Sequence, residues 1–137
     1  MPKYLLLKHY NGGPAPIGNH GPMTGWAPED VTAHLDAQRR IGDELRASGE
    51  FIDAQALAPT GSYVRFGGPD AAPVTDGPFP EAKELIAGWY LVDVDSEARA
   101  LEIAAHVSSA PGRGGRPLYE WIEVRPVLED VPATDQA

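Results

Sequence analysis

The chain has 137 residues, of which 42% are hydrophobic, and this length and composition indicate one globular domain with a single core. The formal net charge of −9 and the scattered Lys and Arg residues argue against phosphate binding, so we expect no nucleic-acid partner. The absence of cysteine excludes disulfides, thiol catalysis and cysteine metal sites. No apolar run approaches the ~20 residues of a membrane span, and the first residues lack a signal-peptide cleavage site, so we expect no membrane contact and a cytoplasmic location.

The first predicted element is a strand over residues 4–10, in which Lys8 shares a face with Leu6. A glycine- and proline-rich loop over residues 11–27 follows, and it is long for a connection inside a compact domain. Such a loop is either a functional flap or a disordered insertion. Trp26 favours partial docking of the loop, which makes it a candidate substrate-binding residue.

Pro28 begins the first predicted helix because proline suits a first helical position, and Gly49 ends it. At 100° per residue, His34 and Gln38 fall within the apolar stripe of this helix, one turn apart. Polar side chains on a buried face require hydrogen-bond partners, so these two residues are the most informative irregularity in the sequence. The apolar members of the stripe are Val31, Leu35, Ile41, Gly42 and Leu45.

A second strand is predicted over residues 51–57. One face carries Ile52, Ala54 and Ala56, and the other carries Phe51, Asp53, Gln55 and Leu57. A hairpin is predicted over residues 63–75, because a short apolar strand is followed by glycine and proline and then by a return strand.

The second half of the chain continues with a short helix, a buried strand, a longer helix and a last strand. Ser96 caps the longer helix. Its inner face is expected to contain Ala98, Leu101, Ala104 and Ala105. The four predicted elements cover residues 80–85, 89–94, 96–107 and 118–125.

The order of these elements is βαββαβ with a hairpin extension, which predicts an α+β fold of the ferredoxin-like type. Its two helices would cover one face of an antiparallel sheet. The other face is expected to be apolar, since large apolar residues lie at alternate positions along the strands: Phe51, Leu57, Trp89 or Tyr90, and Trp121. An open apolar sheet face predicts association, so we expect a homodimer.

Several segments together resemble the DGPF-domain family within the YCII-related superfamily. The turn formed by Asp76, Gly77, Pro78 and Phe79 is similar to the family's signature. Further agreement lies in the predicted strands, over residues 3–7, 48–57, 88–95 and 119–126. The resemblance implies a dimeric α+β barrel, formed by two sheets face to face. The domain would span residues 1–127, with residues 128–137 as a polar C-terminal tail.

His34 and Asp76 form the leading candidate for catalysis. Histidine exchanges protons near neutral pH, and a carboxylate orients its ring and raises its pKa. The resemblance points the same way, because members of the wider superfamily often place a His–Asp pair in the cleft. Two alternatives stay open: His34 as a core-edge residue bonded to a carbonyl, and Asp76 as the first residue of an Asx-turn.

Four further residues are candidates for substrate binding. Gln38 lies beside His34, and Trp26 lies at the end of the loop before the helix. Asp53 and Gln55 would line the same pocket from the sheet, because polar groups in an apolar cleft orient ligands. The alternative for Asp53 and Gln55 is an edge strand wetted by solvent. The histidines show no HxH or HExxH spacing, so no metal site is predicted.

The resemblance and these candidates predict a small cofactor-independent enzyme of isomerase or lyase type. It would act on a small, cyclic organic molecule by proton transfer through His34. The alternative is a non-catalytic ligand-binding or accessory protein associated with sigma-factor regulation, because DGPF domains resemble proteins encoded near, or fused to, extracytoplasmic-function sigma factors. A ligand-sized cavity that contains His34 would favour an enzyme or a sensor, and a filled core would favour a structural role.

Overall fold

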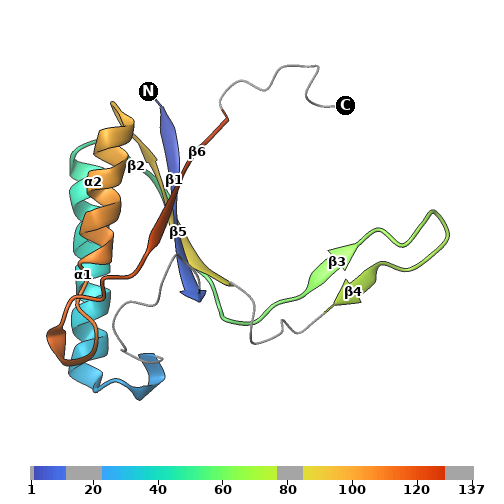
Figure 1. Ribbon diagram of the computed structural model, residues 1–137, viewed down its shortest axis with the longest axis horizontal. Coiled ribbons are helices and arrows are strands. Elements are labelled where there is room, and N and C mark those ends of the chain that lie inside the picture. Colours follow the sequence, from blue (N-terminus) through green and yellow to red (C-terminus); the bar gives the residue numbers. More distant parts are fainter. Residues whose placement is uncertain (1, 12–22, 77–84, 129–137) are drawn as a thin grey trace.

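The computed structural model describes residues 2–11, 23–76 and 85–128 (Figure 1). A four-stranded sheet and two helices form the body of the protein, and a two-stranded hairpin extends from it. The body consists of β1 (Lys3–Asn11), α1 (Pro28–Ala47), β2 (Phe51–Ala56), β5 (Leu85–Asp93), α2 (Glu97–Ser108) and β6 (Ile122–Pro126). The hairpin consists of β3 (Tyr63–Arg65) and β4 (Val74–Asp76), and the 3-10 turns are η1 (Met23–Gly25) and η2 (Arg113–Gly115).

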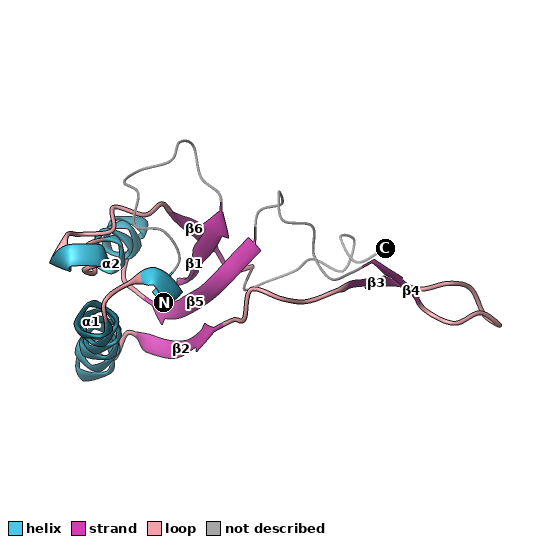
Figure 2. Ribbon diagram, turned by 90° about the horizontal axis from the view of Figure 1, so that it is seen from below, coloured by secondary structure: helices cyan, strands magenta, loops and turns pink. Residues whose placement is uncertain are grey.

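The sheet has the strand order β2-β5-β1-β6, and its neighbouring strands are antiparallel. The two helices each connect strands that are not neighbours, which is the split βαβ arrangement of the ferredoxin-like fold. Figures 1 and 2 show both helices on one face of the sheet. The α+β, ferredoxin-like prediction is therefore confirmed for the single chain. The described residues of one chain do not close a barrel, because the outer strands β2 and β6 of the sheet do not pair with each other.

Local signals in the sequence set the limits of both helices. Pro28 occupies the first turn of α1, and Gly49 ends the helix with a φ of +79°, which costs glycine little. Ser96 caps α2 by accepting a hydrogen bond from the backbone N–H of Arg99. Among the described residues, neither helix is both long and apolar enough to cross a membrane.

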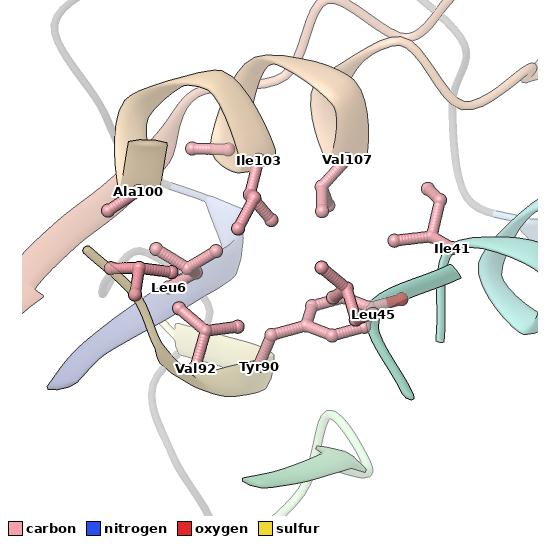
Figure 3. Packing of buried hydrophobic residues seen from close by; sticks show 10 residues of the cluster. Leu6, Ile41, Leu45, Tyr90, Val92, Ala100, Ile103 and Val107 are labelled. Carbon is pink, nitrogen blue, oxygen red and sulfur yellow. The ribbon is translucent and has the colours of Figure 1, made fainter. Parts of the chain in front are cut away.

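The hydrophobic core lies between the helices and the sheet (Figure 3). Side chains of α1 and α2 meet those of the two central strands there. Leu6, Val92 and Val107 are fully buried at the centre of this contact. The other members are Ile41, Leu45, Tyr90, Val94, Ala100, Ile103 and Ala104.

The predicted inner face of α2 is confirmed at Ala104 and is wrong at its other three positions, because the buried face is rotated about the helix axis. Leu101 is 50% exposed, and Ala98 and Ala105 are exposed as well. The buried residues are Ala100, Ile103, Ala104 and Val107. Since α2 carries apolar residues around much of its circumference, periodicity alone does not choose the face that packs. On α1 the predicted stripe is correct except at Leu35, which is 49% exposed while Ala37 is buried.

A β-bulge in β2 overturns the predicted face of Phe51. The pairing of β2 with β5 shifts register between Phe51 and Asp53. An extra residue in one strand reverses the alternation of side chains, so Phe51 packs on the helix-side core. The guanidinium of Arg46 lies 4.2 Å from the centre of the Phe51 ring and covers it.

The predicted hairpin is present as β3 and β4, and it projects away from the body of the protein (Figures 1 and 2). The side chains of both strands are exposed. Three other predictions lie outside the described residues: most of the loop over 11–27, the short helix over 80–85 up to its last residue, and the tail beyond 128.

An ion pair connects the end of α1 to α2, and it yields a prediction about stability. Arg99 donates two hydrogen bonds of 2.8 Å to the carboxylate of Glu50, which lowers the pKa of Glu50. We expect Glu50→Gln to lower the free energy of unfolding by about 1 kcal/mol, because Arg99 is partly exposed and screened. Urea denaturation at pH 7 measures the change. Asp36→Asn, which removes the exposed pair with Arg39, is the matched control and should cost less. An equal loss in both variants would contradict the prediction.

Candidate functional site

The site is centred on His34, a buried polar side chain on the inner face of α1 with 4% of its surface exposed. Its Nδ1 atom lies 3.0 Å from the carbonyl oxygen of Pro111, in the loop that follows α2. A carbonyl oxygen only accepts, so Nδ1–H is the donor and the neutral ring carries its lone pair on Nε2. Among the residues that the structure describes, no side chain bonds to Nε2.

The surroundings of His34 favour the neutral imidazole. Burial is the largest effect and lowers the pKa of His34, and the charge of Lys8 lowers it further. The hydrogen bond to Pro111 and the charge of Glu120 act in the opposite direction but do not cancel the shift. At pH 7 the ring is therefore neutral and can accept a proton at Nε2.

Gln38 lies one turn along α1 from His34 and is held by Tyr90 of β5. The Tyr90 hydroxyl donates to the side-chain oxygen of Gln38 and lies 3.4 Å from its backbone oxygen. Burial, and then the charge of Glu120, raise the pKa of Tyr90 to about 12, so the hydroxyl keeps its proton. The amide nitrogen of Gln38 is buried, and within the described part of the chain it has no hydrogen-bond partner.

Lys8 and Glu120 form a partly buried ion pair next to this cluster. The Lys8 ammonium lies 3.1 Å from a carboxylate oxygen of Glu120, and the two side chains are 16% and 23% exposed. Lys8 projects from β1 on the helix side, since Leu6, two residues earlier, lies in the core. Both charges act on His34.

The backbone around Glu120 is strained and held by α2. Tyr119 has a φ of +55°, which is unfavourable for a residue with a side chain. Its N–H donates to the carbonyl of Ser108, and the Ser108 hydroxyl donates to the carbonyl of Glu120 at 2.6 Å. These bonds fix the position from which the Glu120 side chain reaches Lys8.

Trp26 forms one wall beside His34. The two rings meet edge to face, with centroids 5.7 Å apart, and Trp26 is buried. The loop after α2 holds this segment in place, because Arg113 donates to the carbonyl of Gly25 and the Gly114 N–H donates to Asp30. An open depression of about 450 Å³ lies against Trp26, lined by Met23, Thr24, Trp26, Pro28 and Val31.

The structure does not bring Asp76 to His34. Asp76 is the exposed last residue of β4, in the hairpin that projects from the body, and the hydrogen-bond acceptor for His34 is Pro111. The alternative of a histidine bonded to a carbonyl therefore describes the observed contact. The sequence motif places Asp76 in a turn but does not determine where its hairpin points.

Asp53 and Gln55 lie on the other side of the sheet from His34. They pair with Leu91 and Trp89 of β5, whereas the intervening Tyr90 faces the helices. Gln55 is exposed, and its amide lies 3.5 Å from an oxygen of Asp53. A role for these two residues in substrate binding stays a prediction, and it would require a site on the open face.

Comparison with known proteins identifies the family. The family model for the YCII-related domain matches residues 3–126. The chain belongs to the YCII-related domain family. A search of curated proteins finds no match. The narrower DGPF assignment stays a prediction, and most of its signature turn lies outside the described residues.

Three residues of this YCII-related site were not predicted from the sequence: Lys8, Tyr90 and Glu120. A signal existed for Lys8, because it shares a strand face with the core residue Leu6. Tyr90 and Glu120 showed no such signal, since they read as a core aromatic and as an exposed strand charge. Within residues 2–11, 23–76 and 85–128, no group of three His, Cys, Asp or Glu side chains could hold a metal ion.

The lowered pKa of His34 predicts how the stability of the YCII-related domain depends on pH. The unfolded chain takes up a proton on this residue near pH 6.5, whereas the folded protein does so at lower pH. The stability from a neutral His34 is therefore complete above about pH 6.5 and is lost as pH falls through the folded-state pKa. We expect the free energy of unfolding in urea to decrease from pH 7 to pH 5, with a smaller decrease in His34→Gln. Equal pH dependence in the two proteins would disprove the assignment.

Proposed function

We propose that this YCII-related protein is a small cofactor-independent enzyme of isomerase or lyase type that acts on a small, cyclic organic molecule. The observation that carries the proposal is the buried, neutral imidazole of His34, whose Nδ1–H is bonded to Pro111. That bond leaves the lone pair on Nε2, which can remove a proton from a substrate and return it to another atom.

The surroundings of His34 support this chemistry. A base works best when its pKa lies near the operating pH, because it must be unprotonated and still basic enough to take a proton. Burial and the nearby Lys8 lower the pKa of His34, which keeps the imidazole in the proton-accepting form at neutral pH. Trp26 provides an apolar aromatic wall against which a ring compound can stack, and the depression beside Trp26 is open to solvent.

A homodimer is the second part of the proposal. On β1 and β5, the residues between the core residues point to the open face, and they include Leu5, Trp89 and Leu91. Within the described part of the chain, this face carries no helix (Figure 2). Two chains that placed their open faces together would bury these residues and complete the α+β barrel that the family resemblance implies.

The proposed role of His34 is tested by removing its imidazole. We expect His34→Ala to keep the fold but to lose turnover of a compound that native mass spectrometry identifies as a ligand, because the proton acceptor is gone. Loss by a factor of about 10² or more is expected for a general base. His106→Ala, which removes an exposed histidine bonded to Glu44, is the control and should retain turnover.

Two results would contradict this role. Ligand binding without turnover in the wild type would favour the non-catalytic ligand-binding or accessory alternative. Turnover that survives in His34→Ala, together with a loss of several kcal/mol in stability, would make His34 a structural core residue.

The dimer is tested by placing a charge on the open face. We expect Leu91→Glu to convert a dimer into a monomer in sedimentation experiments at micromolar concentration, because a buried unpaired charge is costly at an interface. Leu101→Glu, at a half-exposed position on the outside of α2, should remain dimeric. A monomeric wild type would disprove the dimer.

A further inference from the structure

Resting on the proposed function, we infer that the side-chain amide of Gln38 binds the substrate's carbonyl oxygen, so that the substrate is a neutral carbonyl compound with an acidic hydrogen on the adjacent carbon. The inference begins with the Gln38 amide nitrogen, a buried donor with no partner among the described residues. Such a donor costs folding free energy, and a ligand that supplies an acceptor removes this cost.

Tyr90 determines which end of the Gln38 amide is available. Its hydroxyl donates to the side-chain oxygen of Gln38, and burial keeps that hydroxyl protonated. The oxygen of the amide is thereby occupied, and the nitrogen is the end without a partner. The site therefore provides a hydrogen-bond donor, which matches a carbonyl oxygen or an oxyanion and not a hydroxyl hydrogen.

The spacing of Gln38 and His34 suits one carbonyl compound. Residues four apart on a helix face have Cβ atoms about 5–6 Å apart, so the amide and the imidazole project side by side from α1. A carbonyl group and its neighbouring carbon can bridge two groups at that separation. Val31, which lines the depression, lies one turn before His34 on the same helix. His34 and Gln38 lie further along α1, beyond the residues that line the depression.

The charges around the site favour a neutral carbonyl over a carboxylate. The ammonium of Lys8 is paired with the carboxylate of Glu120, so the pair contributes no net charge to compensate an anionic ligand. An anion in a partly buried site requires such compensation. A ketone or lactone does not, and the negative charge that develops on its oxygen in the transition state is met by the Gln38 N–H.

The step conserves atoms and charge without a co-reactant. Nε2 of His34 takes the proton as the C–H bond breaks, and the electron pair moves through the adjacent carbon to the carbonyl oxygen, which forms an enolate. The imidazolium then returns the proton to the same carbon or, in an unsaturated ring, to a carbon conjugated with it, and the carbonyl re-forms. The net reaction is an isomerisation or a hydrogen exchange with solvent.

The experiment follows exchange of the acidic hydrogen in D₂O by NMR, with cyclopentanone, γ-butyrolactone and cyclohex-3-en-1-one as probes and cyclohexanecarboxylate as the charged comparison. We expect exchange or double-bond migration of a neutral probe above the buffer rate. His34→Ala should abolish it. Gln38→Met, which keeps the length of the side chain without its donor, should lower kcat by about 10²–10³, as expected when one oxyanion donor is lost.

Tyr90→Phe tests the positioning of the Gln38 amide while preserving the shape of the core. Because the phenol touches Gln38 and not the substrate, its loss should lower kcat by about tenfold while KM changes little. Circular dichroism and thermal unfolding confirm that each variant is folded. Should Gln38→Met not fold, Tyr90→Phe takes its place as the deciding variant.

The results separate the inference from the proposed function. Exchange that depends on His34 but persists in Gln38→Met and in Tyr90→Phe overturns the role of Gln38 and leaves the proton-transfer enzyme standing. Exchange of the carboxylate with none of the neutral probes overturns the substrate class alone. A rate equal to that of buffer for every probe overturns the carbonyl inference, while turnover of a different ligand by the wild type, lost in His34→Ala, would preserve the proposed function.

Discussion

The hydrogen bond from His34 to the carbonyl of Pro111 is the contact on which the candidate site depends. It joins α1 to the loop between α2 and β6, which are far apart in the sequence. It also decides which ring nitrogen holds the proton, because a carbonyl can only accept. Without this acceptor a buried imidazole would adopt either tautomer, and Nε2 would not be committed to accepting a proton.

The same loop organises both sides of the site. Toward α1, Arg113 and Gly114 hold the segment that carries Trp26. Toward the sheet, the strained backbone of this loop at Tyr119 is bonded to Ser108, the last residue of α2, which places Glu120 beside Lys8. Strained backbone persists only where surrounding contacts enforce it, and it is found preferentially at functional sites. The loop after α2 therefore connects the aromatic wall at Trp26, the base His34 and the ion pair of Lys8 with Glu120.

Apolar and polar packing occupy different ends of the interface between the helices and the sheet. Leu6, Val92 and Val107 lie at the centre of the core and are fully buried (Figure 3). The polar side chains of His34 and Gln38 on α1 and of Tyr90 on β5 lie on the same inner faces of these elements. Burying polar groups is unfavourable unless they are paired, so the Gln38 amide nitrogen, which has no partner among the described residues, lowers the stability of this end of the interface.

The sequence by itself determined the fold class and the polar face of α1. Strand alternation, the proline and glycine at the ends of α1 and the serine cap of α2 are local signals, and each acts over a few residues. His34 and Gln38 stood out because helical periodicity alone puts them among buried positions. Trp26 likewise stood out because a large aromatic residue is unusual in a loop.

Only the tertiary structure decided which residues contact His34, Gln38 and Trp26 in the folded protein. The partner of His34 is a backbone carbonyl, which no side-chain pattern can reveal. Asp76 lies in a hairpin that projects from the body of the protein, and the turn sequence does not determine the direction of that hairpin. The bulge in β2 places Phe51 on the helix side of the sheet. The sequence of α2 has more than one apolar stripe, and packing against the sheet selects which of them is buried. These outcomes depend on packing between segments distant in sequence, whereas propensity and periodicity report only on near neighbours.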